Sequence, residues 1–65
     1  MKKYITTVND FYTFNTPNSS VMLGIPKGTI LIEKDGELYF DGICAIDSLY
    51  FLLYNGFIEE YTETI

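Results

Sequence analysis

The spacing of apolar residues along the chain is that of β-strands up to Phe40 and that of a helix after it. Within Ser20–Ile25 the apolar residues Val21, Leu23 and Ile25 alternate with others, which is typical of a half-buried strand. Residues 2–8 and 11–14 are rich in β-branched and aromatic residues. They predict either one bent strand or two short strands that break at Asn9-Asp10.

Residues 29–40 predict a β-hairpin, and two registers are compatible with its sequence. A two-residue turn at Asp35-Gly36 would pair Lys34 with Glu37. It would place Ile30, Ile32 and Tyr39 on one face, and Leu31, Leu38 and Phe40 on the other. A three-residue loop, Lys34-Asp35-Gly36, would instead collect four apolar residues on one side: Ile30, Ile32, Leu38 and Phe40. We favour the three-residue loop, because it separates apolar from polar side chains better and a one-residue shift reverses every side chain.

After Phe40 the apolar residues follow one face of a helix. They are Ile46, Leu49, Tyr50, Leu53 and Phe57. Asp47 or a residue just before it can cap the start, and Gly56 can end the helix in the left-handed conformation. Residues 57–62 then return to an extended conformation.

These elements predict an α+β fold in a single domain spanning residues 1–65. The expected architecture is a small, curled antiparallel sheet of four or five strands, with one short helix near residues 46–55. The sheet is either open or closed into an SH3-like barrel, and the pattern does not choose between them.

The size of the chain limits how it can be stabilised. A core of this size contributes only about 3–5 kcal/mol of net stability. The chain has one cysteine, Cys44, and no histidine, so neither an internal disulfide nor a zinc site can supplement that core. An aromatic core or self-association remains, and eleven of the 65 residues are Phe or Tyr.

The targeting signals that can be read from the sequence are absent. No apolar run approaches the ~20 residues of a membrane span, and no apolar stretch follows the lysines at the N-terminus. We therefore expect a cytoplasmic protein that does not bind membranes.

The sequence offers little for catalysis. It has no histidine to act as a general base, and its glycines form no phosphate-binding loop. Cys44 lies among apolar residues in the acidic half, so we expect a buried, poorly nucleophilic thiol rather than a redox sensor. Asp41 and Asp47 lack the spacing of a calcium loop and fit turn and cap roles. We expect no enzymatic activity, no cofactor and no metal.

The charges are segregated along the chain. All four lysines lie at or before Lys34, and the first 34 residues have a net charge of +2. Residues 35–65 hold seven carboxylates and no basic residue, and the whole chain has a net charge of −5. Such a chain is repelled by phosphate, which argues against direct binding of nucleic acid. It favours a basic partner.

Tyrosines accompany these carboxylates, and tyrosine is enriched in binding hot spots. We therefore predict a non-enzymatic protein-binding module that docks onto a basic surface of a larger protein, for example a nucleic-acid-handling enzyme. The predicted contact residues are Glu37, Tyr39, Tyr54, Glu59, Glu60, Tyr61 and Glu63. In size and composition the chain resembles accessory proteins of phages and mobile elements, including inhibitors of host enzymes. The alternative is a structural subunit that forms a homodimer or larger homo-oligomer through its apolar sheet face or an open strand edge.

Overall fold

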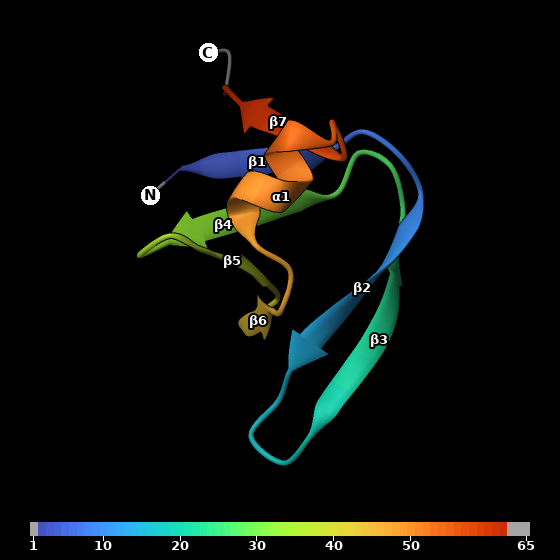
Figure 1. Ribbon diagram of the computed structural model, residues 1–65, viewed down its shortest axis with the longest axis vertical. Coiled ribbons are helices and arrows are strands. Elements are labelled where there is room, and N and C mark those ends of the chain that lie inside the picture. The colour runs from blue at the N-terminus through green and yellow to red at the C-terminus, as the bar shows by residue number, and fades with distance from the viewer. Residues whose placement is uncertain (1, 63–65) are drawn as a thin grey trace.

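Residues 2–62, which the computed structural model describes, form one seven-stranded sheet and one short helix (Figure 1). The strands are β1 (Lys3–Thr6), β2 (Asp10–Asn15), β3 (Ser20–Ile25), β4 (Ile30–Lys34), β5 (Glu37–Phe40), β6 (Ile43–Ala45) and β7 (Ile58–Tyr61). The helix α1 (Leu49–Tyr54) precedes β7. The strand order is β3-β2-β6-β5-β4-β1-β7, and every paired neighbour is antiparallel.

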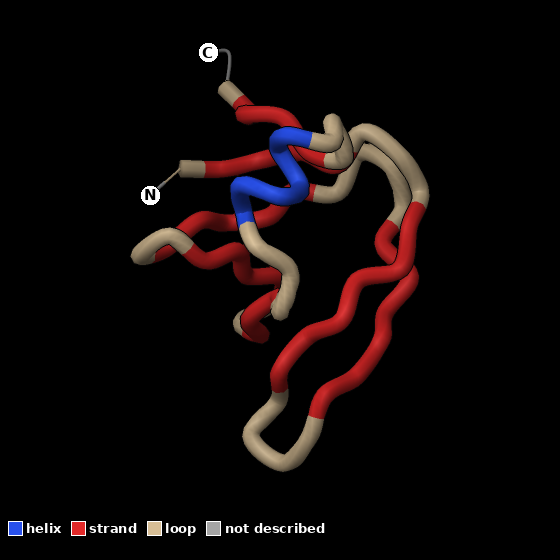
Figure 2. The backbone as a smooth tube through the Cα atoms, viewed as in Figure 1, coloured by secondary structure: helices blue, strands red, loops and turns tan. Residues whose placement is uncertain are grey.

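The α+β class is confirmed, whereas the count of four or five strands is wrong and the sheet does not close into an SH3-like barrel. β3 and β7 remain the two edges of an open sheet. The reason is visible in Figure 2, where β2 and β3 extend as a long hairpin away from the other strands. We call residues 10–25 the arm.

The arm is attached at its base through Thr6, which is 2% exposed. The Thr6 backbone N–H donates to Thr29 O (3.0 Å), and its hydroxyl donates to Pro26 O (2.8 Å). The same hydroxyl accepts from the Thr29 N–H (2.9 Å). A single buried threonine therefore joins the end of β1 to the turn between β3 and β4, just before the chain enters the arm.

The β4–β5 hairpin has the two-residue turn, so the favoured three-residue loop is wrong. Lys34 is paired with Glu37, and both Asp35 (φ 55°) and Gly36 (φ 84°) have positive φ. Positive φ at both central residues matches the twist of the flanking strands, and Asp-Gly is a preferred dipeptide for it. Glu33, the polar residue that this register turns toward the core side, is stabilised because its carboxylate accepts the Gly36 N–H at 2.8 Å.

This register decides which isoleucines and leucines enter the core. Leu31 and Leu38 are fully buried, whereas Ile30 and Ile32 are 37% and 38% exposed. The expectation that Ile30 and Ile32 belong to the core is therefore wrong. A shift of one residue in the pairing of β4 with β5 places Leu31 in the core in place of Ile30 and Ile32.

Strand β6 was not expected from the sequence, although a signal for it exists. Phe40 pairs with Ile43 across a second Asp-Gly turn, where Asp41 (φ 51°) and Gly42 (φ 83°) again have positive φ. The repeated dipeptide makes β4, β5 and β6 a three-stranded meander. β6 then pairs with β2 and so connects the arm to the rest of the sheet.

The helix is shorter than expected, and its predicted buried face is confirmed only in part: Leu49 is buried, and Leu53 and Phe57 pack against the core. It begins after Ser48, which occupies the N-cap position in place of Asp47 and forms no side-chain capping bond. Its buried residues are Leu49 and Leu52, whereas Tyr50 is exposed. Ile46 was also expected on the buried face, but it is exposed. It lies in the connection between β6, which ends at Ala45, and the helix, which begins at Leu49.

The predicted end of the helix is confirmed. Gly56 has φ 73°, its N–H donates to Leu53 O, and the Phe57 N–H donates to Leu52 O. This pair of bonds is a Schellman motif, in which a left-handed glycine satisfies the last carbonyls of the helix. It turns the chain directly into β7.

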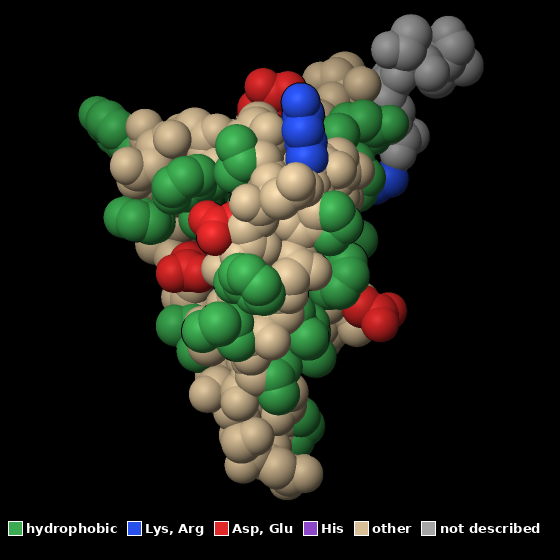
Figure 3. All heavy atoms as spheres, turned by 90° about the vertical axis from the view of Figure 1, so that its right-hand side faces the viewer, with side chains coloured by type: hydrophobic (Ala, Val, Ile, Leu, Met, Phe, Trp, Pro, Cys, Tyr) green, Lys and Arg blue, Asp and Glu red, His purple; other side chains and the backbone are tan. Residues whose placement is uncertain are grey.

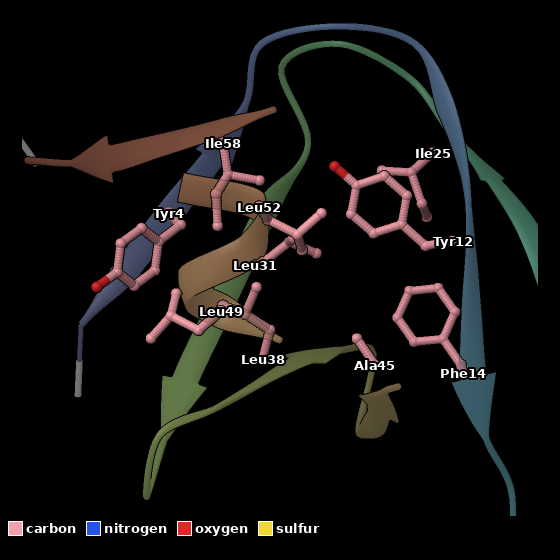
Figure 4. Close-up of a cluster of buried hydrophobic side chains, with 10 residues drawn as sticks. All are labelled: Tyr4, Tyr12, Phe14, Ile25, Leu31, Leu38, Ala45, Leu49, Leu52 and Ile58. Atoms are coloured by element: carbon pink, nitrogen blue, oxygen red, sulfur yellow. The ribbon is translucent and has the colours of Figure 1, made fainter. Parts of the chain in front are cut away.

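The core lies between the concave face of the curled sheet and α1 (Figure 4). Its members are Tyr4, Tyr12, Phe14, Ile25, Leu31, Leu38, Ala45, Leu49, Leu52 and Ile58. The Phe14 ring lies 6.4 Å from the Tyr12 ring and 6.0 Å from the Phe40 ring. Aromatic side chains thus connect the arm to β5, and aliphatic side chains connect the helix to β1, β4 and β7.

The Tyr12 hydroxyl is buried and has no hydrogen-bond partner among the described residues. Burial, with Asp10 and Asp47 nearby, raises the pKa of Tyr12. We expect Tyr12→Phe to raise the free energy of unfolding by about 1 kcal/mol, because it removes an unsatisfied polar group and keeps the ring. Urea denaturation of wild type and variant measures this difference.

Two further observations check the Tyr12 prediction. Tyr54→Phe, at a residue that is 94% exposed, should leave stability unchanged. Since the folded state holds the pKa of Tyr12 above that of the unfolded chain, wild type should lose stability as the pH rises through 10, and Tyr12→Phe should lose less. A destabilised Tyr12→Phe would mean that the hydroxyl has a favourable partner.

Candidate protein-binding surface

The sheet face opposite α1 is formed by the strands β7, β1, β4, β5 and β6. We call it the outward face. Paired residues in antiparallel strands lie on the same face, so the register defines its members. They are Lys3, Ile5, Ile30, Ile32, Lys34, Glu37, Tyr39, Cys44, Glu59 and Tyr61.

The centre of the outward face is apolar and aromatic. Ile32 lies between Lys3 and Tyr39 in neighbouring strands, and Tyr61 lies on the far side of Lys3. A shallow depression of about 440 Å³ is lined by Ile32, Lys34, Tyr39, Asp41 and Gly42. The sequence reasoning missed the isoleucines of this face because it assigned them to the core. The Asp-Gly turn was the signal that could have placed them correctly.

The structure brings together four of the seven predicted contact residues: Glu37, Tyr39, Glu59 and Tyr61. Glu60 lies on the opposite face, since it pairs with Tyr4 of the core. Tyr54 is exposed at the end of α1, on the helix side of the sheet. Glu63 lies outside the described residues. The seven residues therefore do not form one continuous surface.

The charge segregation of the sequence is not preserved in space. β1, from the basic half, lies between β4 and β7, so Lys3 sits beside Tyr61. Lys34 is opposite Glu37, and Lys2 Nζ lies 3.5 Å from Glu60 Oε2. The outward face thus carries two lysines and two glutamates around its apolar centre. Its local charge is balanced, while the chain as a whole remains acidic.

Cys44 lies half-buried on the outward face rather than in the core, which corrects the sequence expectation. Its Sγ donates to Glu37 Oε2 (3.3 Å), and Tyr39 Oη donates to the same oxygen (3.4 Å). Burial, and then the hydrogen bond and charge of Glu37, raise the pKa of the Cys44 thiol. The expected weak nucleophilicity is consistent with this environment.

We expect Glu37→Gln to increase the rate at which iodoacetamide alkylates Cys44. The substitution removes the charge that disfavours the thiolate, so at pH 8 a larger fraction of the thiol is ionised, and we expect a rate gain of roughly 3-fold. Mass spectrometry of quenched time points measures the rate. Glu59→Gln on the same face is the matched control and should react like wild type. Equal rates in both variants would show that Glu37 does not control this thiol.

Other kinds of site have little support in the part of the chain from residue 2 to residue 62. No group of three or more acidic, cysteine or histidine side chains there is placed to hold a metal ion. No helix in this part is both long enough and apolar enough to cross a membrane. Comparison with protein-family models, with curated proteins and with solved structures finds no significant match.

Proposed function

We propose that this protein is a non-enzymatic protein-binding module whose contact surface is the outward face. The observation that carries the proposal is the exposure of Ile30 and Ile32, with Tyr39 beside Ile32 and Tyr61 beyond Lys3, on a face that no other element of residues 2–62 covers. Grouped exposed apolar residues rimmed by charged ones are typical of protein interaction sites.

The proposed partner is a basic protein, such as a nucleic-acid-handling enzyme. With a net charge of −5, the chain attracts a basic partner from a distance. The balanced charges on the outward face contribute little to that attraction, so affinity in the complex comes mainly from the apolar centre. Salt should therefore slow association and have little effect on dissociation.

The test compares two double variants in capture experiments from lysate, followed by kinetic measurements on the purified partner. Ile30→Ser/Ile32→Ser removes the apolar centre without touching the core. Tyr50→Ser/Tyr54→Ser removes exposed aromatics from the helix side and is the matched control. We expect the first variant to lose a basic partner that wild type and control both retain.

Two results would contradict the proposal. One is a partner that still binds Ile30→Ser/Ile32→Ser with unchanged affinity. The other is self-association through the outward face, which is the competing function. Salt distinguishes the two functions. Copies of the chain, each with a net charge of −5, repel one another, so self-association would strengthen as the salt concentration rises.

A further inference from the structure

The two edges of the sheet differ in how they are protected against pairing with another strand. An edge strand presents unpaired backbone groups, and proteins block such pairing with charged side chains, prolines or bulges. β7 carries adjacent carboxylates, Glu59 and Glu60. β3 has the sequence SVMLGI, with neither a charged residue nor a proline. β3 is therefore the unprotected edge.

The backbone of β3 is directed so that pairing at this edge is possible. Thr13 O accepts the Ile46 N–H at 2.9 Å, so the backbone of Thr13 points away from β3. Hydrogen bonding alternates along an antiparallel pair, so its cross-strand neighbour Met22 points away from β2. The same alternation directs the N–H and C=O groups of Ser20 and Gly24 to the free edge.

Apolar side chains flank these free backbone groups. Met22 is 68% exposed and Phe11 is 69% exposed, and both lie on one face of the arm. The Phe11 ring covers Gly24, where an added Cβ would lie 3.3 Å from the ring edge. On the other face, Val21 is partly exposed. A second strand placed here would bury apolar surface on both of its faces.

Residues 11–26 contain no charged residue, although the chain has a net charge of −5. Figure 3, which faces the β3 side, shows only apolar and uncharged polar surface over the lower part of the arm. The arm projects away from the rest of the sheet and α1, which we call the body (Figure 1), and its one charged residue, Asp10, is its first residue. Two identical copies can thus approach at this edge with the least like-charge repulsion.

We propose that the β3 edge pairs with the β3 edge of a second copy of this chain, forming an antiparallel dimer around a two-fold axis. This inference does not rest on the proposed function, because it uses a different surface. A two-fold axis at Met22 places it opposite Met22 of the second copy, and Ser20 opposite Gly24. These three hydrogen-bonded positions would form about six backbone hydrogen bonds.

The same register gives each side chain an uncharged neighbour. Val21 meets Leu23 of the second copy, and the small Ser20 leaves room beside the Phe11 ring. Continuing the register places Asn18 and Ser19 of the second copy next to Ile25 and Pro26. A depression of about 650 Å³ lies there, lined by Asn9, Asp10, Phe11, Gly24, Ile25 and Pro26. The tip of one arm would thus rest at the base of the other.

The experiment is sedimentation velocity from 5 to 500 µM on wild type and three variants. Met22→Pro removes an N–H that points to the free edge and leaves the bonds to β2 intact. Met22→Lys places a charge on the two-fold axis. Tyr61→Lys adds the same charge to the outward side of the other edge strand, β7, and is the matched control. Circular dichroism confirms that each variant is folded.

We expect wild type and Tyr61→Lys to dimerise, and both Met22 variants to raise the dimer dissociation constant by about 100-fold. Met22→Pro removes one backbone hydrogen bond from each copy, and Met22→Lys places two like charges next to each other on the axis. Amide exchange should slow at Met22 and Gly24 as the concentration of wild type rises. A wild type that stays monomeric up to 500 µM would overturn the proposal. So would a dimer that Met22→Lys leaves unchanged, or one that Tyr61→Lys disrupts.

Discussion

Replacing Leu31 with alanine is expected to lower the free energy of unfolding by about 2–5 kcal/mol and to leave much of the protein unfolded. Leu31 is fully buried between β4 and the helix, and its truncation leaves a cavity in the core. A domain of this size has only about 3–5 kcal/mol of stability to lose. Urea denaturation followed by circular dichroism measures the change.

Ile32→Ala is the matched control, because the neighbouring side chain points to the outward face. Because 38% of the Ile32 surface is already exposed, we expect Ile32→Ala to lower the free energy of unfolding by about 1 kcal/mol or less. The pair of variants also tests the register of the β4–β5 hairpin. If Ile32→Ala were the more damaging change, the three-residue loop would be correct and the core assignment would have to be reversed.

Phe14→Ala is expected to lower the free energy of unfolding by about 3–5 kcal/mol. Phe14 is fully buried, and its ring connects Tyr12 in the arm to Phe40 in the body. β2 and β6 share only two residue pairs, of which Phe14 with Ala45 is one. We therefore expect loss of this side chain to separate the arm from the body before the rest of the sheet unfolds.

Amide hydrogen exchange distinguishes this local separation from global unfolding. In Phe14→Ala, protection should fall first in β2, β3 and β6, and later in β1, β4 and β7. Phe11→Ala on the same strand is the control, since Phe11 is largely exposed and should cost much less. Equal losses in the two variants would show that the arm does not depend on the aromatic contacts of the core.

Local signals in the sequence predicted much of the secondary structure. Alternation placed β3, and the composition of residues 2–8 and 11–14 predicted one bent strand or two short ones, of which the structure has the two, β1 and β2. Gly56 marked the end of the helix correctly. These features depend on neighbours within a few residues, and a short window of sequence contains the necessary information.

The same reasoning failed where two local signals competed. At residues 34–36, the separation of apolar from polar side chains favoured one register, while the Asp-Gly dipeptide favoured the other. Turn geometry prevailed, because Asp35 and Gly36 match the strand twist and the exposed isoleucines of β4 are tolerated on an open face. The turn role expected for Asp41 is confirmed, but strand β6, which follows this second Asp-Gly turn, was not predicted.

The candidate binding surface was predicted only in part. Glu37, Tyr39, Glu59 and Tyr61 do share a face, but their common position depends on β7 pairing with β1 and β5 pairing with β4. No local pattern encodes those long-range pairings. They also bring Lys3, from the basic half of the chain, next to Tyr61 in the acidic half. Charges that are segregated along the sequence are therefore mixed in the folded protein.

The sequence by itself determined the class of fold, the small size of the core, the net acidity, the strand at residues 20–25 and the end of the helix. Each of these follows from composition or from residues close together in the chain. Only the tertiary structure decided which residues face outward, how the charges are distributed and which sheet edge is unprotected. These properties depend on strand order and register, which are set by packing between segments far apart in sequence.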